Sequence, residues 1–154
     1  MENLSQLDPR WAKMLLGNST TSTIKRYGCK LTSLAMMAYK KPPEVNEILK
    51  KAGAFNVDLI SDTRAAKALG MKYDGVLARS ALPEKPCIVE VDYNKFLSGK
   101  QQHFAVWLGF KNSQGQWMIK DPLSPPNSMN IPLPKKYDII SFRMFHEMKP
   151  NPHA

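Results

Sequence analysis

The first residue of chemical interest is Cys29, which directly follows Gly28 at the predicted start of a helix. A thiol there faces backbone N–H groups without acceptors and the positive end of the helix dipole, and both favour the thiolate. The small preceding residue leaves room for a substrate to approach the sulfur. The alternative is a structural cysteine packed as a small hydrophobe, the commoner role of a free cysteine. Cys87, which opens an apolar strand, fits that alternative.

A base for such a thiol is available in His103, which lies between a polar stretch and the apolar run 104–110. The rim of a sheet is a position from which an imidazole reaches a thiol on another element. A base is needed because only a few per cent of an ordinary thiol is ionised at neutral pH. The alternative is a histidine that is hydrogen-bonded at a strand end without a role. His146 and His153 are weaker candidates, and no two histidines have the helical spacing of a metal site.

A third group, Asp121, follows from hairpin geometry. If residues 103–110 and 116–121 pair as an antiparallel hairpin, the numbers of opposed residues sum to about 226, and Asp121 faces Ala105. Asp121 and His103 then lie one diagonal step apart on one face, roughly 7–8 Å apart at the backbone. A slip of one residue would separate them. Asp121 would hold the imidazole in one tautomer; the alternative is an Asp-Pro turn.

The fourth candidate is Gln6, near the start of the sequence. Its side-chain amide could donate a hydrogen bond to an oxyanion that develops beside Cys29. The alternative is a solvated surface side chain.

The composition indicates one globular domain. The chain has 154 residues, of which 43% are hydrophobic and 23% charged, and this length suits one core. We expect a domain over residues 1–148 and a flexible tail over 149–154. No apolar run approaches the roughly 20 residues of a membrane span, and the first residues lack a secretory signal, so synthesis in the cytoplasm is expected. The two cysteines form no disulfide framework, and we expect no metal or organic cofactor.

The net charge of +9 would favour approach to a polyanion, and the alternative is that the lysines are simply solvated. An acidic cell wall or a nucleic acid would be attracted by such a charge. The lysines are scattered, however, and no nucleic-acid-binding motif accompanies them, so specific nucleic-acid recognition is not predicted. A basic nucleic-acid binder stays an alternative, and it predicts binding that weakens steeply with salt.

The elements that must position these residues are helices followed by strands, which favours the α+β class with an antiparallel sheet. Apolar residues at helical spacing, with stops at proline and glycine, predict helices over 28–39, 42–52 and 62–69. Apolar runs between turn residues predict strands over 87–91, 104–110, 116–120 and 139–145.

Taken together, these residues resemble the papain-like cysteine peptidases, and among them the bacteriocin-processing, double-glycine leader peptidases and their stand-alone bacterial and phage relatives. The resemblance covers roughly residues 4–124. It rests on an ordered set of short segments: Gln6-Leu7-Asp8-Pro9-Arg10-Trp11, Gly17, Thr23-Ile24, Gly28-Cys29, Pro42-Pro43-Glu44-Val45-Asn46, Pro86-Cys87-Ile88-Val89, His103-Phe104-Ala105-Val106-Trp107-Leu108-Gly109 and Asp121-Pro122.

The resemblance implies a cysteine on a central helix that packs against a sheet carrying His and Asp. Cys29 would be the nucleophile, His103 the general base and acid, Asp121 the orienting carboxylate and Gln6 the oxyanion donor. The surround Gly28-Cys29-Lys30 differs from the Asp-Cys-Gly frequent in that branch, and no transporter segment follows. The resemblance therefore implies the chemistry but not the double-glycine substrate.

The predicted function is a thiol protease or amidase that hydrolyses a peptide bond, with cell-wall (peptidoglycan) peptides as the expected substrate. In a phage setting the protein would reach the wall within a virion or through lysis. A peptidase-like binding module or structural (virion) subunit without turnover is the alternative of a different class.

Overall fold

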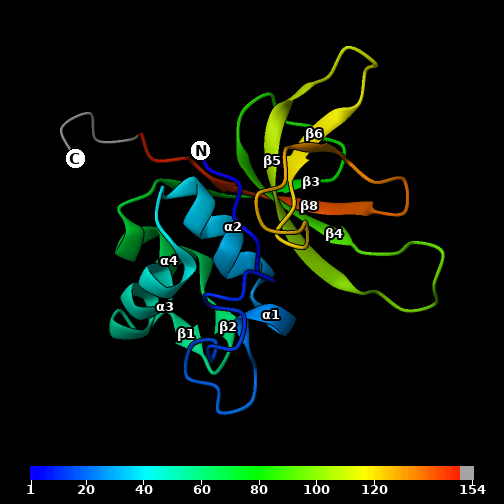
Figure 1. Cartoon of the computed structure of the whole chain (residues 1–154). Helices are drawn as coiled ribbons and strands as arrows, with labels where there is room; N and C mark the ends of the chain where they lie inside the picture. Colours follow the sequence, from blue (N-terminus) through cyan, green and yellow to red (C-terminus); the bar gives the residue numbers. More distant parts are fainter. Residues whose placement is uncertain (150–154) are drawn as a thin grey trace.

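The computed structural model describes residues 1–149 and has an α+β architecture, with helices on one side of an antiparallel sheet (Figure 1). The predicted tail falls almost wholly on residues 150–154, which lie outside the described residues. The helices are α1 (Ile24–Tyr27), α2 (Cys29–Met37), α3 (Pro42–Lys51) and α4 (Asp62–Leu69). The strands are β1 (Phe55–Asn56), β2 (Leu59–Ile60), β3 (Tyr73–Ala78), β4 (Cys87–Asp92), β5 (Gln102–Lys111), β6 (Trp117–Lys120), β7 (Ile131–Pro132) and β8 (Asp138–Phe145).

The three predicted helices are present, and α4 has the caps that its sequence predicts. Helix α4 begins after Ser61, whose side chain accepts a hydrogen bond from the Arg64 N–H, and ends at Gly70 in the left-handed conformation. Helix α3 begins at Pro42, where proline is compatible with the first turn. The short helix α1 was not predicted. It precedes α2 directly, with only Gly28 between them.

The large sheet has the strand order β3-β8-β4-β5-β6-β7, and all its pairs are antiparallel. Strand β5 lies in the interior, as its apolar sequence predicts. Strand β8 is inserted between β3 and β4, although it is the last strand in sequence. Strand β3 was not predicted, because most of its residues are exposed and it carries no apolar alternation.

The predicted register of the β5–β6 hairpin is confirmed at the end that carries His103. Val106 pairs with Lys120 and Trp107 with Ile119, and both sums equal 226. Toward the turn the register shifts, because the strand is irregular between Trp107 and Lys111. Gly109 lies in this stretch with φ +80°, and a Cβ there would meet the Lys85 backbone nitrogen at 2.3 Å. The irregularity thus stays away from the candidate site.

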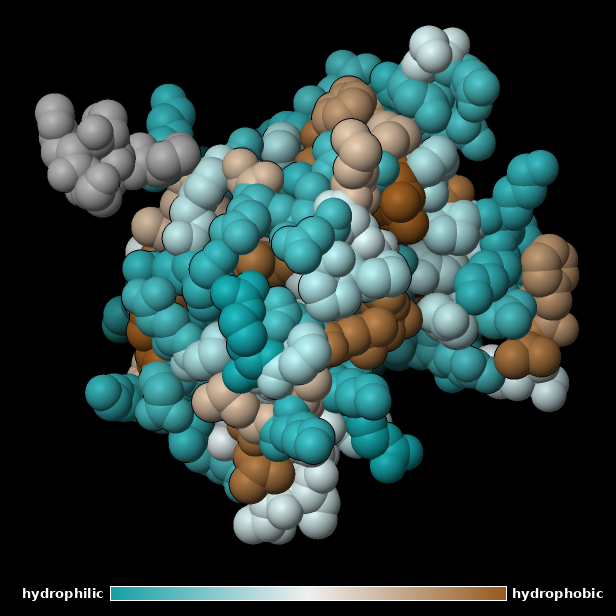
Figure 2. All heavy atoms as spheres, in the orientation of Figure 1, coloured by the Kyte–Doolittle hydropathy of each residue, from teal (hydrophilic) through white to brown (hydrophobic). Residues whose placement is uncertain are grey.

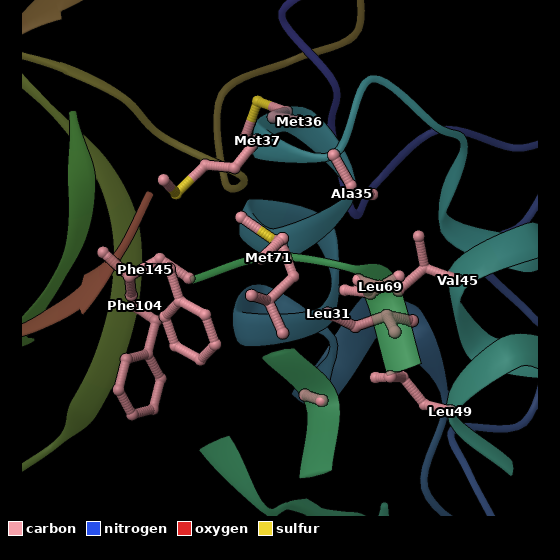
Figure 3. Close-up of a cluster of buried hydrophobic side chains, with 14 of the residues drawn as sticks. Leu31, Ala35, Met36, Met37, Val45, Leu49, Leu69, Met71, Phe104 and Phe145 are labelled. Carbon is pink, nitrogen blue, oxygen red and sulfur yellow. The ribbon is translucent and has the colours of Figure 1, made fainter. Parts of the chain in front are cut away.

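The central strands β4 and β5 are buried on both faces of the sheet. The helix-side core contains Leu31 and Leu34 of α2 and faces Phe104 and Phe145 of the sheet. Figure 3 shows Phe104 and Phe145 on the sheet side of this cluster, with Leu31 and the helical residues opposite. The strand-side core lies on the other face and is rich in aromatic residues. Its members include Cys87, Val89, Ala105, Trp107, Ile119, Tyr137 and Phe142.

No helix within residues 1–149 is long and apolar enough to cross a membrane. Those residues likewise contain no group of three or more His, Cys, Asp and Glu side chains with the arrangement of a metal site.

Candidate active site

His103 and Asp121 form a buried pair at the start of β5 and the end of β6. Nε2 of His103 lies 2.8 Å from Oδ1 of Asp121. His103 is 4% exposed and Asp121 is 6% exposed. The last pair of the hairpin at this end is Val106 with Lys120, and the same register extended by one residue places Asp121 opposite Ala105, one diagonal step from His103.

Every oxygen of the Asp121 carboxylate accepts a hydrogen bond. Oδ1 also accepts from the Leu123 N–H at 2.9 Å, and Oδ2 accepts from the Tyr137 hydroxyl at 2.5 Å. Burial alone would raise the pKa of Asp121. The hydrogen bonds from His103, Tyr137 and Leu123 outweigh burial and lower this pKa. The carboxylate is therefore held ionised and in one orientation.

The imidazole of His103 lies between Asp121 and Cys29. Burial would lower the pKa of His103, but hydrogen bonds with Asp121 and Cys29, together with their charges, raise it to about 9. Because Nε2 is engaged by Asp121, Nδ1 is the nitrogen left for the Cys29 sulfur. At neutral pH the ring carries both protons, and an imidazolium is the partner that stabilises a neighbouring thiolate.

Cys29 is the first residue of α2, as the sequence predicts, and it is half-buried. Its backbone N–H belongs to the first turn, whose N–H groups have no acceptor within the helix. The structure gives a packing reason for Gly28. A Cβ at this position would lie 2.4 Å from the Ile24 carbonyl oxygen, so glycine permits the close junction of α1 and α2.

Gln6 is 2% exposed, so the alternative of a solvated surface side chain is wrong. Its Nε2 donates to the Lys25 carbonyl at 2.8 Å and makes a long contact of 3.5 Å with the Ile24 carbonyl. Its backbone N–H donates to the Pro122 carbonyl at 2.8 Å. Gln6 thus connects α1 with the loop that follows Asp121. One amide hydrogen is well bonded and the second is held only weakly.

Two hollows meet at Cys29. The smaller, of about 180 Å³, is lined by Gln6, Cys29 and His103, among others. The larger, of about 370 Å³, extends from Cys29 toward Leu59 and Phe104. The visible surface is mainly hydrophilic, with hydrophobic side chains in separate groups (Figure 2). The thiol, the imidazole and the Gln6 amide are therefore grouped at one hollow that can admit a ligand.

Two tyrosines at the site were not predicted from the sequence. The ring of Tyr137 lies edge-on to His103 with centroids 5.8 Å apart, and Tyr93 lies edge-on at 6.0 Å. Tyr137 follows a proline-rich loop with no motif of its own. In the sequence Tyr137 is simply a tyrosine shortly before a predicted strand, and this position does not indicate that its hydroxyl contacts Asp121.

The remaining candidates lie away from this group. Cys87 is 0% exposed, and burial raises the pKa of its thiol to about 12, although the charge of Lys85 opposes the shift. His146 pairs with Asp74 at 2.6 Å in an exposed position. His153 lies outside the described residues.

Comparisons of this chain with protein-family models, with curated proteins and with solved structures found no match.

Proposed function

We propose that this protein is a cysteine-type peptidase or amidase with a papain-like arrangement of its reactive groups. The observation that carries the proposal is the hydrogen-bonded series from Tyr137 through Asp121 to His103, with Cys29 lining the same hollow as the imidazole. Its inner members are buried, while the thiol at its end borders two hollows. This is the geometry that nucleophilic hydrolysis of an amide requires.

In the proposed reaction the Cys29 thiol has given its proton to Nδ1 of His103 before the substrate binds, so the resting pair is a thiolate beside an imidazolium. The thiolate sulfur then forms a bond to the scissile carbonyl carbon, and the negative charge moves to the carbonyl oxygen. The backbone N–H of Cys29 and the second amide hydrogen of Gln6 are the donors for that oxygen. The C–N bond breaks as His103 protonates the leaving amine, which leaves a thioester on Cys29.

The second half of the reaction reverses these roles. His103 now accepts a proton from water, and the water oxygen forms a bond to the thioester carbonyl carbon. The C–S bond breaks, the acid product leaves, and the thiolate–imidazolium pair is restored, with the proton from water on His103. Asp121 holds the imidazole in the required orientation throughout and stabilises the imidazolium.

Peptides of an anionic cell wall are the substrate class that the net charge of +9 favours. A protein acting on such peptides would meet them within a virion or after lysis of the cell.

Selective alkylation is the first test of this proposal. Iodoacetamide at pH 6, followed by peptide mapping, should modify Cys29 and leave Cys87 unmodified, because Cys87 is buried and its pKa is raised. Slow labelling of Cys29 at the rate of a free thiol would contradict the proposal.

Hydrolysis is the second test. The protein is incubated with purified peptidoglycan and, separately, with a mixed peptide library, and new amino termini are identified by mass spectrometry. Wild-type protein should create new termini, and Cys29→Ala should lower their rate of formation at least about a thousandfold. A reactive Cys29 without any new termini would instead support the binding or structural subunit.

A further inference from the structure

The larger hollow beside Cys29 contains three cationic side chains, and two of them are already paired. Lys30 forms an ion pair with Asp62. Arg143 contacts Asp62 at 2.8 Å and Glu90 at 2.7 Å. Lys30 and Arg143 therefore tie α2 to the sheet, and their charges are compensated within the protein.

Arg26 is the third cation of this hollow, and its situation is different. Its guanidinium has no carboxylate or carbonyl partner within residues 1–149, and its one aromatic contact is with the ring of Tyr27, 5.6 Å from the centroid. Arg26 is exposed and lines both hollows that meet at Cys29. Its free charge is thus available to a ligand.

The lining of the two hollows places Arg26 beside the nucleophile. Arg26 lies on α1, three residues before Cys29, and both residues line both hollows. Gly28 between them has φ −88° and ψ 20°, so it ends α1 and directly precedes the first residue of α2. A carboxylate within reach of Arg26 is therefore on, or next to, the residue whose bond is cleaved.

We propose that Arg26 is a specificity-determining residue that binds a carboxylate of the substrate beside the scissile bond. This inference rests on the proposed function and names the class of substrate: an acidic peptide. A guanidinium binds a carboxylate through two parallel hydrogen bonds, which fixes its position as well as its charge. Asp58 lines only the larger hollow. Its negative charge repels a substrate carboxylate in that part of the hollow, so the preference for a carboxylate applies next to Cys29.

Two alkylating agents that differ in one charge test this proposal. Iodoacetate carries a carboxylate next to its reacting carbon, and iodoacetamide is its neutral counterpart. The ratio of their rates at Cys29 is measured for wild type, for Arg26→Gln and for Lys13→Gln. Lys13 is exposed, and its substitution changes the net charge equally. Arg26→Gln should lower the iodoacetate-to-iodoacetamide ratio about fivefold, and 0.5 M NaCl should reduce the difference.

The outcomes separate this inference from the proposed function. A reactive Cys29 whose rate ratio is unchanged in Arg26→Gln, or falls equally in Lys13→Gln, overturns the role of Arg26 alone. A Cys29 that reacts with both agents at the rate of a free thiol overturns the proposed function instead.

Peptide substrates then distinguish the two sources of a carboxylate. Peptides with Glu or Gln beside the cleaved bond, each with a free or an amidated C terminus, are compared as substrates of wild type and Arg26→Gln. If a side-chain carboxylate is bound, the variant raises KM for the Glu peptides far more than for the Gln peptides. If a terminal carboxylate is bound, the larger rise in KM falls on the free acids. An equal effect on all four peptides contradicts the proposal.

Discussion

The two cores of the protein hold their reactive groups in different ways. The helix-side core carries α2 on aliphatic side chains and leaves Cys29 at its N-terminus half-buried. The strand-side core surrounds His103 and Asp121 with aromatic side chains, and both residues are almost completely buried. A nucleophile must meet its substrate, whereas an acid–base pair benefits from a fixed geometry and restricted water. The candidate site lies where the two cores adjoin.

The largest effect is expected from Asp121→Asn, which disrupts the strand-side arrangement and leaves Cys29 in place. Loss of the carboxylate charge removes the group that orients His103, and turnover should fall about 1,000- to 10,000-fold. Because Asp121 is the principal group that raises the pKa of His103 to about 9, the alkaline limb of kcat/KM should move to lower pH. Asp138→Asn is the matched control, since Asp138 forms an exposed ion pair with Arg79.

The same variant should alter the pH dependence of stability. The pKa of His103 in the folded protein, about 9, lies above its ordinary value of 6.5. Its contribution to stability is therefore complete below pH 6.5 and is lost as the pH rises through about 9. Urea unfolding at pH 6 and pH 9.5 should show this loss in wild type and a smaller one in Asp121→Asn. Equal losses in both proteins would mean that the pair does not control the titration of His103.

The next largest effect is expected from Gln6→Ala, because Gln6 connects the helical part with the loop after Asp121. If its second amide hydrogen stabilises the oxyanion, kcat should fall about 100- to 1,000-fold with little change in KM. The Lys25 carbonyl also loses its partner, so unfolding free energy should fall by about 1 kcal/mol. Gln114→Ala, in an exposed turn, is the control. A loss of stability with turnover kept within threefold would leave Gln6 a structural role only.

The smallest effect on activity is expected at the other cysteine. Cys87→Ser places a hydroxyl in the apolar strand-side core and should destabilise the protein by about 1–3 kcal/mol. Turnover of the folded fraction should stay unchanged, because Cys87 is not at the hollows beside Cys29. Cys29→Ser should show the reverse, with stability retained and turnover lost. Similar losses of turnover in both variants would remove the functional distinction between the cysteines.

The sequence predicted the elements that carry the site better than those around them. The helix start at Cys29 and the pairing register near His103 follow from apolar spacing and a turn, which are local signals. Strand β3 was missed because its pairing with β8 is long-range and most of its side chains are exposed. Its strand conformation depends on a partner that its own residues do not indicate.

Two parts of the site itself depend on tertiary contacts. Tyr137 contacts Asp121 only because the loop before β8 returns to the end of β6. No pattern in the sequence predicts this contact. Gln6 lines the same hollow as Cys29, and it is held there by hydrogen bonds to α1 and to Pro122 that no local signal in the sequence indicates. The sequence shows a small residue at position 28, but only the structure shows that a Cβ there would collide with the backbone of Ile24 at the junction of α1 and α2.

The insertion of β8 between β3 and β4 also sets the order in which the protein can assemble during synthesis. Until residues 138–145 have left the ribosome, β3 has no partner in the sheet and one edge of β4 is open. Phe142, which packs in the strand-side core with Tyr137, is absent from that core until then. A growing chain therefore carries Cys29, which precedes all of these strands, before the sheet that holds His103 is complete.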